Sequence, residues 1–164
     1  MSSKRMIDVT KASSLLQALQ GFPAQIREVA RNESPEMPVW QPAPDAWSMT
    51  MVLAHLTNCE PHFRARFARI IAAQNPTVPG FGPDEAPPRP LRPVHEALGA
   101  FEAERRETLR MIYGFTPTDW DRPAVHLVYG RTTLRGMIEL VTRHDLGHMG
   151  QIHDLVALWH ARHE

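Results

Sequence analysis

Cysteine is almost missing from this sequence, since Cys59 is the only one among 164 residues. A single cysteine cannot form a disulfide within the chain, and chains without disulfides are typical of reducing compartments. The N-terminal stretch MSSKRMIDVTKASS also lacks the apolar segment of a secretory signal peptide. Together these absences lead us to expect a cytoplasmic protein.

Long apolar runs and an excess of charge of one sign are missing as well. No stretch approaches the roughly 18 consecutive apolar residues that a transmembrane helix requires, so we expect no membrane partner. Lysine plus arginine and aspartate plus glutamate each number 18, which leaves a formal net charge of zero with neutral histidines. A nucleic-acid-binding surface usually needs clustered basic residues, so we expect no nucleic-acid partner either.

Proline and histidine, by contrast, are plentiful, with 15 and 9 residues. Most prolines lie in residues 35–44 and 76–93, which cannot be helix interiors because proline lacks the amide donor and clashes with the preceding turn. Outside these zones, apolar residues recur at intervals of three or four, as on one face of a helix. The pattern predicts four helices, at residues 12–31, 49–74, 94–113 and 133–160.

The predicted fold class is all-α. A chain of this length suits one domain, residues 1–164, and four amphipathic helices in one domain predict a four-helix bundle. The long connections 32–48, 75–93 and 114–132 do not require a simple up-down-up-down order. Only AVHLVY (residues 124–129) resembles a strand, and so short a segment does not change the class.

Local signals refine the predicted helices. Ser48 is a good N-cap for the second helix, with Trp47 packing on Val52, and Thr132 or Thr133 would begin the fourth. Pro23 and Pro61 lie inside helices and are expected to bend them. The charged stretch EAERRET (residues 102–108) is expected to form a solvent-exposed face of the third helix.

Polar residues interrupt the apolar face of the fourth helix. His144 and His148 are four residues apart and Gln151 is seven from His144, so all three share a face with apolar Met137 and Leu140. Burying such groups without partners costs about 1–3 kcal/mol each, so they need partners. Three explanations are open at this point: a hydrogen-bonded network in the core, a helix face that turns toward solvent, or a metal site.

A metal site needs a third ligand from another helix. His55, at the edge of the apolar stripe of the second helix, is the candidate, because bundles build metal sites from facing helices. Three neutral imidazoles suit zinc, nickel, iron or copper and leave coordination positions open, as catalytic sites do. Cys59 and His62 follow His55 in the second helix, and neither has a defined role. His126, in the connection 114–132, has none either.

The other histidines are not expected in this site. His153 is half a turn away from His144, on the opposite side of the helix, and is expected at the surface. His160 and His163 lie near the C-terminus and are expected to be solvated. His95 begins the third helix without an assigned partner.

The segment HDLGH (residues 144–148) differs from the zinc-protease motif HExxH by Asp145 in place of the glutamate that acts as general base. Aspartate is one methylene shorter, and nothing further along supplies a third protease ligand. We therefore expect Asp145 to orient a ligand on a neighbouring helix or to pair with Arg143 or Arg135.

Two motifs occur together and in order: WSMTMVLAHL at residues 47–56 and the H-D-x2-H-x2-Q-I pattern at residues 144–152. With the intervening segment FEAERRETLRMIYGFTPTDWDR (residues 101–122), they resemble the DinB-like (DinB/YfiT) metalloprotein superfamily. The resemblance implies a four-helix bundle with up-down-down-up connectivity and often a homodimer. It also implies a divalent metal held by His55, His144 and His148.

The resemblance implies a class of reaction as well, since characterised relatives include transferases and isomerases that use bacillithiol, mycothiol or glutathione. We expect a metal-dependent enzyme of the thiol-transferase or hydrolase type, in which zinc, nickel or iron activates water or a low-molecular-weight thiol for attack on a small electrophilic molecule. Gln151 and Asp145 would support the ligands, and segments 76–93 and 114–132 would line the pocket.

Two alternatives compete with the enzyme. One is a non-catalytic bundle, acting in stress response or ligand binding, in which the metal mainly contributes folding free energy. The other is a helical domain whose seam histidines bond one another and water.

Overall fold

The computed structural model describes the backbone of residues 2–80 and 93–163, and the side chains of residues 11–80 and 93–163. These residues form four long helices, α1 (Ser2–Arg31), α2 (Met49–Ala72), α3 (Val94–Tyr113) and α4 (Leu134–His163). The predicted four-helix bundle is confirmed, and α1 and α2 continue through their internal prolines. Within the described residues, no helix is long and apolar enough to cross a membrane.

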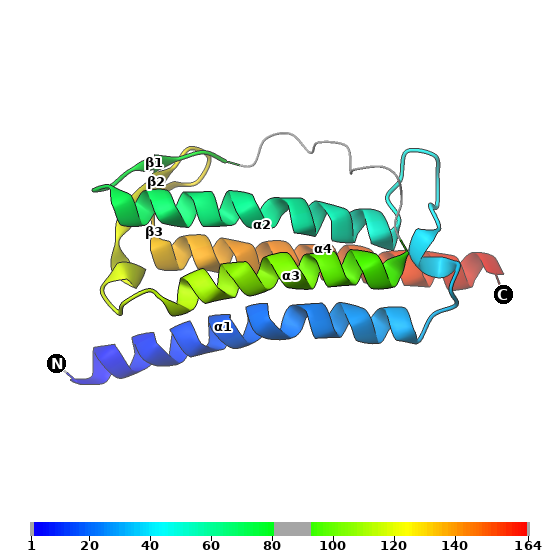
Figure 1. Cartoon of the computed structure of the whole chain (residues 1–164), viewed down its shortest axis with the longest axis horizontal. Helices are drawn as coiled ribbons and strands as arrows, with labels where there is room; N and C mark the ends of the chain where they lie inside the picture. Colours follow the sequence, from blue (N-terminus) through cyan, green and yellow to red (C-terminus); the bar gives the residue numbers. More distant parts are fainter. Residues whose placement is uncertain (1, 81–92, 164) are drawn as a thin grey trace.

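The helices pack around a common axis. Helices α3 and α4 each lie against both α1 and α2, so α1 and α2 face each other across the bundle. In Figure 1, α1 and α4 run in one direction, whereas α2 and α3 run in the other. Residues of α2 and α4 therefore meet at a shared interface.

Side-chain caps explain where two helices begin. The Ser48 hydroxyl accepts a hydrogen bond of 3.3 Å from the amide of Met51, and the Ser48 amide donates to Met51 Sδ at 3.5 Å. The predicted cap of α2 is thus confirmed. At the start of α4, the Thr133 hydroxyl accepts from the amide of Gly136 at 3.2 Å. The hydroxyls of Ser48 and Thr133 thus satisfy the amides of Met51 and Gly136, which have no acceptor within the helix.

A small sheet follows α2 and precedes α4. Strand β1 (Thr77–Val78) pairs in parallel with β2 (Pro123–His126), which pairs in antiparallel with β3 (Gly130–Thr133). The expected strand in residues 124–129 therefore ends at His126. The turn that follows is closed by the ring of His126, whose Nδ1 accepts the amides of Val128 (3.1 Å) and Tyr129 (3.2 Å).

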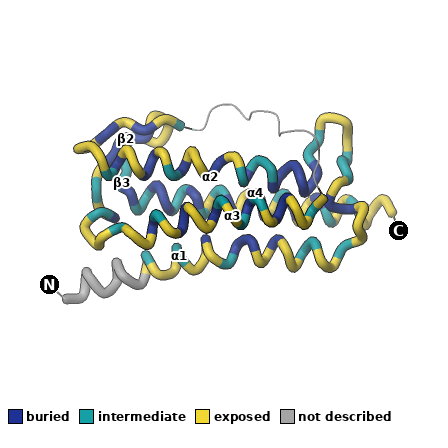
Figure 2. Tube along the Cα trace, viewed as in Figure 1, coloured by how far each residue is buried: buried dark blue, intermediate teal, exposed yellow. Residues whose placement is uncertain are grey.

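The bundle interior contains two apolar clusters along its length. Figure 2 shows buried residues on the helix faces that are turned inward and exposed residues on the outer faces. One cluster contains Leu19, Phe63, Leu109 and Val141, and the other contains Phe22, Leu56, Phe101 and Met149. Between these positions, α2, α3 and α4 each carry one buried charged residue: Glu60, Arg105 and Asp145.

This charged layer corrects one expectation. The stretch 102–108 is not a solvent-exposed face throughout, because Arg105 is only 1% exposed and Thr108 is fully buried. Arg105 lies four residues after Phe101 and four before Leu109, so it occupies the apolar face of α3. The charged neighbours of Arg105 suggested an exposed face, although the helical period places residue 105 on the side that faces the core.

Candidate metal site

Three of the predicted residues come together between α2 and α4. His55 is in the second turn of α2, and His144 and His148 are on successive turns of α4. The Nε2 atom of His144 lies 3.2 Å from Nε2 of His55 and 3.1 Å from Nε2 of His148. One ligand atom from each of the three half-buried residues lies within 4.8 Å of the others. The same atom of each ring thus points to a common centre.

These separations fit a shared metal ion. A tetrahedral ion with metal–nitrogen distances of 2.0–2.1 Å separates its nitrogen ligands by about 3.3 Å. Only a neutral imidazole offers a lone pair, and burial, followed by the charges of His148, His55 and Arg105, lowers the pKa of His144 to about 3. His144 is therefore neutral at physiological pH and ready to bind a metal.

Gln151 fixes the orientation of one ring. Its Oε1 atom lies 2.9 Å from Nδ1 of His148. A carboxamide oxygen can only accept, so Nδ1 carries the proton and Nε2 keeps its lone pair toward the other histidines. The glutamine that the sequence places on the histidine face of α4 therefore supports His148 from behind.

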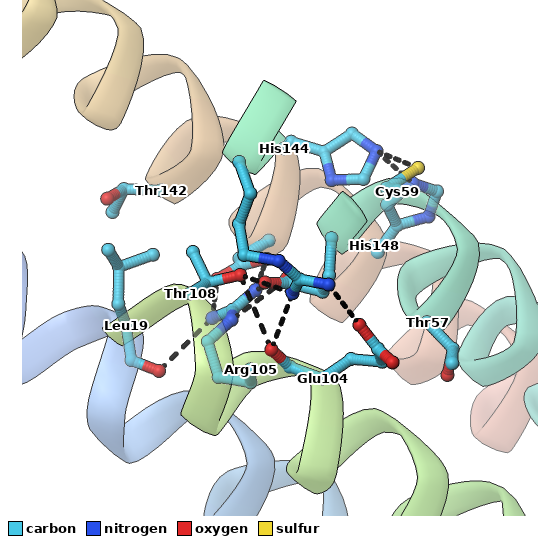
Figure 3. A network of polar contacts seen from close by, with 12 residues as sticks. Leu19, Thr57, Cys59, Glu104, Arg105, Thr108, Thr142, His144 and His148 are labelled. Atoms are coloured by element: carbon cyan, nitrogen blue, oxygen red, sulfur yellow. Dashed lines mark hydrogen bonds and ion pairs between the residues drawn. The ribbon is translucent and has the colours of Figure 1, made fainter. Parts of the chain in front are cut away.

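The histidine cluster has a sulfur atom and aromatic rings beside it. The Sγ atom of Cys59 lies 3.5 Å from Nε2 of His55 and 3.9 Å from Nε2 of His144. Figure 3 shows Cys59 next to the rings, on the side opposite Arg105. The rings of Trp47 and Phe63 are centred 5.2 Å from His55 and 5.6 Å from His144. These contacts limit how far the imidazoles can rotate.

A buried ionic triad lies next to the cluster. Arg105 donates to Glu60 Oε1 from Nε (2.9 Å) and Nη2 (2.8 Å), and to both oxygens of Asp145 at 2.7 and 2.9 Å. Burial lowers the pKa of Arg105, but the hydrogen bonds and charges of the two carboxylates outweigh it and raise the pKa above its ordinary value. Burial raises the pKa of Asp145 to about 6, against the opposing pull of Arg105.

The triad corrects the expectation for Asp145. Its hydrogen bonds go to Arg105, while Arg143 is exposed and Arg135 lies 3.5 Å from Asp121. Both carboxylate oxygens of Asp145 bind one guanidinium, so this side chain is not placed as the general base of a protease motif. Sequence reasoning missed Arg105 and Glu60, although both lie at core positions of their helices.

The remaining predicted residues lie apart from the cluster. His62 and His153 are exposed, and the latter lies on the outer side of α4 as predicted. His126 is buried in the β2–β3 hairpin, where its ring closes the turn. Of the proline-rich segment 76–93, residues 81–92 lie outside the described part of the chain, so its role as a pocket wall stays a prediction.

The fold and the cluster together define a helical bundle that could hold a metal ion on three histidines. The sequence profile of the DinB superfamily matches residues 18–152. The chain therefore belongs to the DinB superfamily, as its motifs predicted. No curated protein matches the chain significantly in sequence.

A solved structure shares the architecture. YfiT from Bacillus subtilis is described as a probable metal-dependent hydrolase with an unusual four-helix bundle topology. It superimposes with a TM-score of 0.70 over 88% of this chain and 85% of YfiT, at 14% sequence identity. At that identity the likeness demonstrates a common fold.

Proposed function

We propose that the protein is a metal-dependent enzyme, of the hydrolase or thiol-transferase type, that acts on a small electrophilic molecule. The observation that carries this proposal is the convergence of three imidazole Nε2 atoms from His55, His144 and His148. Membership of the DinB superfamily and the description of YfiT as a probable metal-dependent hydrolase support it.

The chain prepares this centre in three ways. Burial keeps His144 neutral, and Gln151 holds His148 in the tautomer that presents Nε2. The half-buried positions of the rings restrict the water around them, which strengthens electrostatic interactions. A divalent ion held there, zinc, nickel or iron, would supply Lewis-acid activation of water or of a thiol.

Hydrolysis and thiol transfer differ in the attacking group. In hydrolysis the attacking group is water, whereas in thiol transfer it is a low-molecular-weight thiol such as bacillithiol, mycothiol or glutathione. We place hydrolysis first because YfiT carries that description. A cytoplasmic homodimer is part of the same proposal and follows only from the family resemblance and the composition.

A second candidate is a non-catalytic bundle that acts in stress response or ligand binding. The same histidines support it, because a metal that joins α2 to α4 would contribute folding free energy without any reaction. Turnover separates the two candidates.

Metal analysis of tag-free protein, purified without chelator, is the first test. We expect close to one divalent ion per chain in the parent and in His153→Ala, whose histidine is on the outer side of α4, and clearly less in His148→Ala. Less than about 0.2 ion per chain in the parent would contradict both the enzyme and the non-catalytic metal-binding bundle.

Turnover is the second test. The metal-loaded protein is assayed on activated esters and on alkyl halides, each with and without the three thiols. Metal-dependent turnover that His148→Ala lacks and His153→Ala retains supports an enzyme. Full metal loading with no turnover and no thiol-induced shift in melting temperature favours the non-catalytic bundle.

A further inference from the structure

Cys59 extends the histidine cluster on α2. It follows His55 by four residues, just as His148 follows His144 by four residues on α4. Residues four apart lie on one face of a helix, so each of the two facing helices presents a pair of side chains that can bind a metal. The Sγ atom of Cys59 lies 3.5 Å from Nε2 of His55 and 3.9 Å from Nε2 of His144.

Two sulfur–nitrogen distances, to His55 and His144, are close to those of a tetrahedral centre. With metal–nitrogen distances of 2.0–2.1 Å and a metal–sulfur distance of 2.3 Å, nitrogen and sulfur ligands of zinc lie about 3.6 Å apart. Cys59 is only 5% exposed, so its sulfur faces the cluster rather than bulk water. The two measured sulfur–nitrogen distances lie on either side of the tetrahedral value.

We propose that Cys59 is a fourth protein ligand, which binds the metal as a thiolate beside three imidazole nitrogens. The inference rests on the proposed metal site. The thiol loses its proton to solvent as the metal–sulfur bond forms, and no electron is transferred. A soft sulfur ligand favours zinc over magnesium or manganese.

This ligand also regulates access to the site. With sulfur bound, all four tetrahedral positions are filled by protein, and a reactant reaches the metal only when Cys59 gives up its place. Cys59→Ala would leave three imidazoles and an open position, so the proposed reaction would proceed faster per bound ion in this variant.

Cobalt(II) is the direct probe, because a cobalt–thiolate bond gives an intense near-ultraviolet charge-transfer band that nitrogen and oxygen ligands do not give. We expect this band in the full chain and in Asn58→Ser, which changes the exposed neighbour of Cys59. Cys59→Ser should lose the band and keep the weaker visible bands of bound cobalt. Since the chain has a single cysteine, a thiolate band can come only from Cys59.

The outcomes separate the two proposals. Bound cobalt without a charge-transfer band in the parent overturns the sulfur ligand and leaves the three-histidine site intact. Failure to bind cobalt or zinc at all overturns the metal site itself.

Alkylation by iodoacetamide tests the unmodified chain even where a variant does not fold. A metal-bound thiolate reacts slowly, so zinc should slow alkylation of Cys59 by at least ~10-fold, and chelator should restore the rate. Equal rates with and without stoichiometric bound zinc would overturn the sulfur ligand.

Discussion

The guanidinium of Arg105 donates a hydrogen bond of 3.1 Å to the backbone carbonyl of Leu19 (Figure 3). In a regular helix this oxygen accepts from the amide four residues later, but that residue is Pro23, which has no amide hydrogen. Arg105 thus supplies the donor that proline removes from α1. The same side chain binds Glu60 and Asp145, so one residue joins all four helices beside His144.

Arg105→Met should lower the free energy of unfolding by about 3–5 kcal/mol, because two buried carboxylates lose their only described cationic partner. Urea denaturation measures the change. The matched control is Arg106→Met on the exposed face of the same helix, with an expected change within ~0.5 kcal/mol. Similar losses in the two variants would contradict a structural role for the triad.

An apolar replacement of the whole triad should recover part of that loss. In the triple variant with Glu60→Leu, Arg105→Met and Asp145→Leu, no buried charge remains unpaired, and such replacements are often neutral or stabilising. The carbonyl of Leu19 still lacks a donor, which costs about 1–3 kcal/mol. We expect stability between the parent and the single variant, measured by the same urea titrations. A triple variant less stable than Arg105→Met would refute this reasoning.

Gln151→Leu should weaken zinc binding by about 10–100-fold, since it removes the acceptor that sets the tautomer of His148. Gln151→Glu keeps an acceptor and should retain most of the affinity. Competition with a chromogenic chelator measures the dissociation constants, and Asp154→Asn, on the exposed side of α4, is the control. Equal affinities for the leucine and glutamate variants would show that the hydrogen bond has no such role.

Zinc should stabilise the folded chain through His148. At a free concentration of 100 times its dissociation constant, a ligand of the folded state adds about 2.7 kcal/mol to the free energy of unfolding. We expect this gain in the parent and in His153→Ala, its loss on adding chelator, and a much smaller gain in His148→Ala at the same free zinc concentration. Thermal denaturation with buffered zinc measures this gain in stability. An equal gain in His148→Ala would show that the ion binds elsewhere.

Acid should destabilise the hairpin through His126. Burial, and then the charge of Arg66, lowers the pKa of this imidazole below its ordinary 6.5. Between the folded and unfolded pKa values the unfolded chain binds more protons, so the free energy of unfolding falls as the pH drops below about 6.5. Above that pH both states hold a neutral ring, and the contribution is constant.

His126→Asn should therefore reduce the loss of stability between about pH 7.5 and pH 5, relative to the parent. Urea denaturation across that range measures the slope. The exposed His62 serves as control, because His62→Asn should leave the slope unchanged. An unaltered slope in His126→Asn would show that the hairpin imidazole does not carry the acid sensitivity.

The periodicity of the sequence was enough to predict that there are four helices, although α1 begins at Ser2, ten residues before the predicted start. Proline marked the segments that lie between them, and apolar spacing located α3 at residues 94–113 as the structure has it. Spacing along one helix also put His144, His148 and Gln151 on one face, since a helix has a fixed rotation per residue. These are local relationships, which depend on the backbone alone.

Local spacing could not predict which residues on different helices contact each other. The partner of Asp145 is Arg105, forty residues earlier, and sequence alone favoured arginines nearer in the chain. His55 was a candidate ligand from its own helix, but the distance between its Nε2 and that of His144 depends on how α2 packs against α4. Crossing distance and rotation of packed helices are set by all their side chains together, so only the tertiary structure decides which polar groups meet.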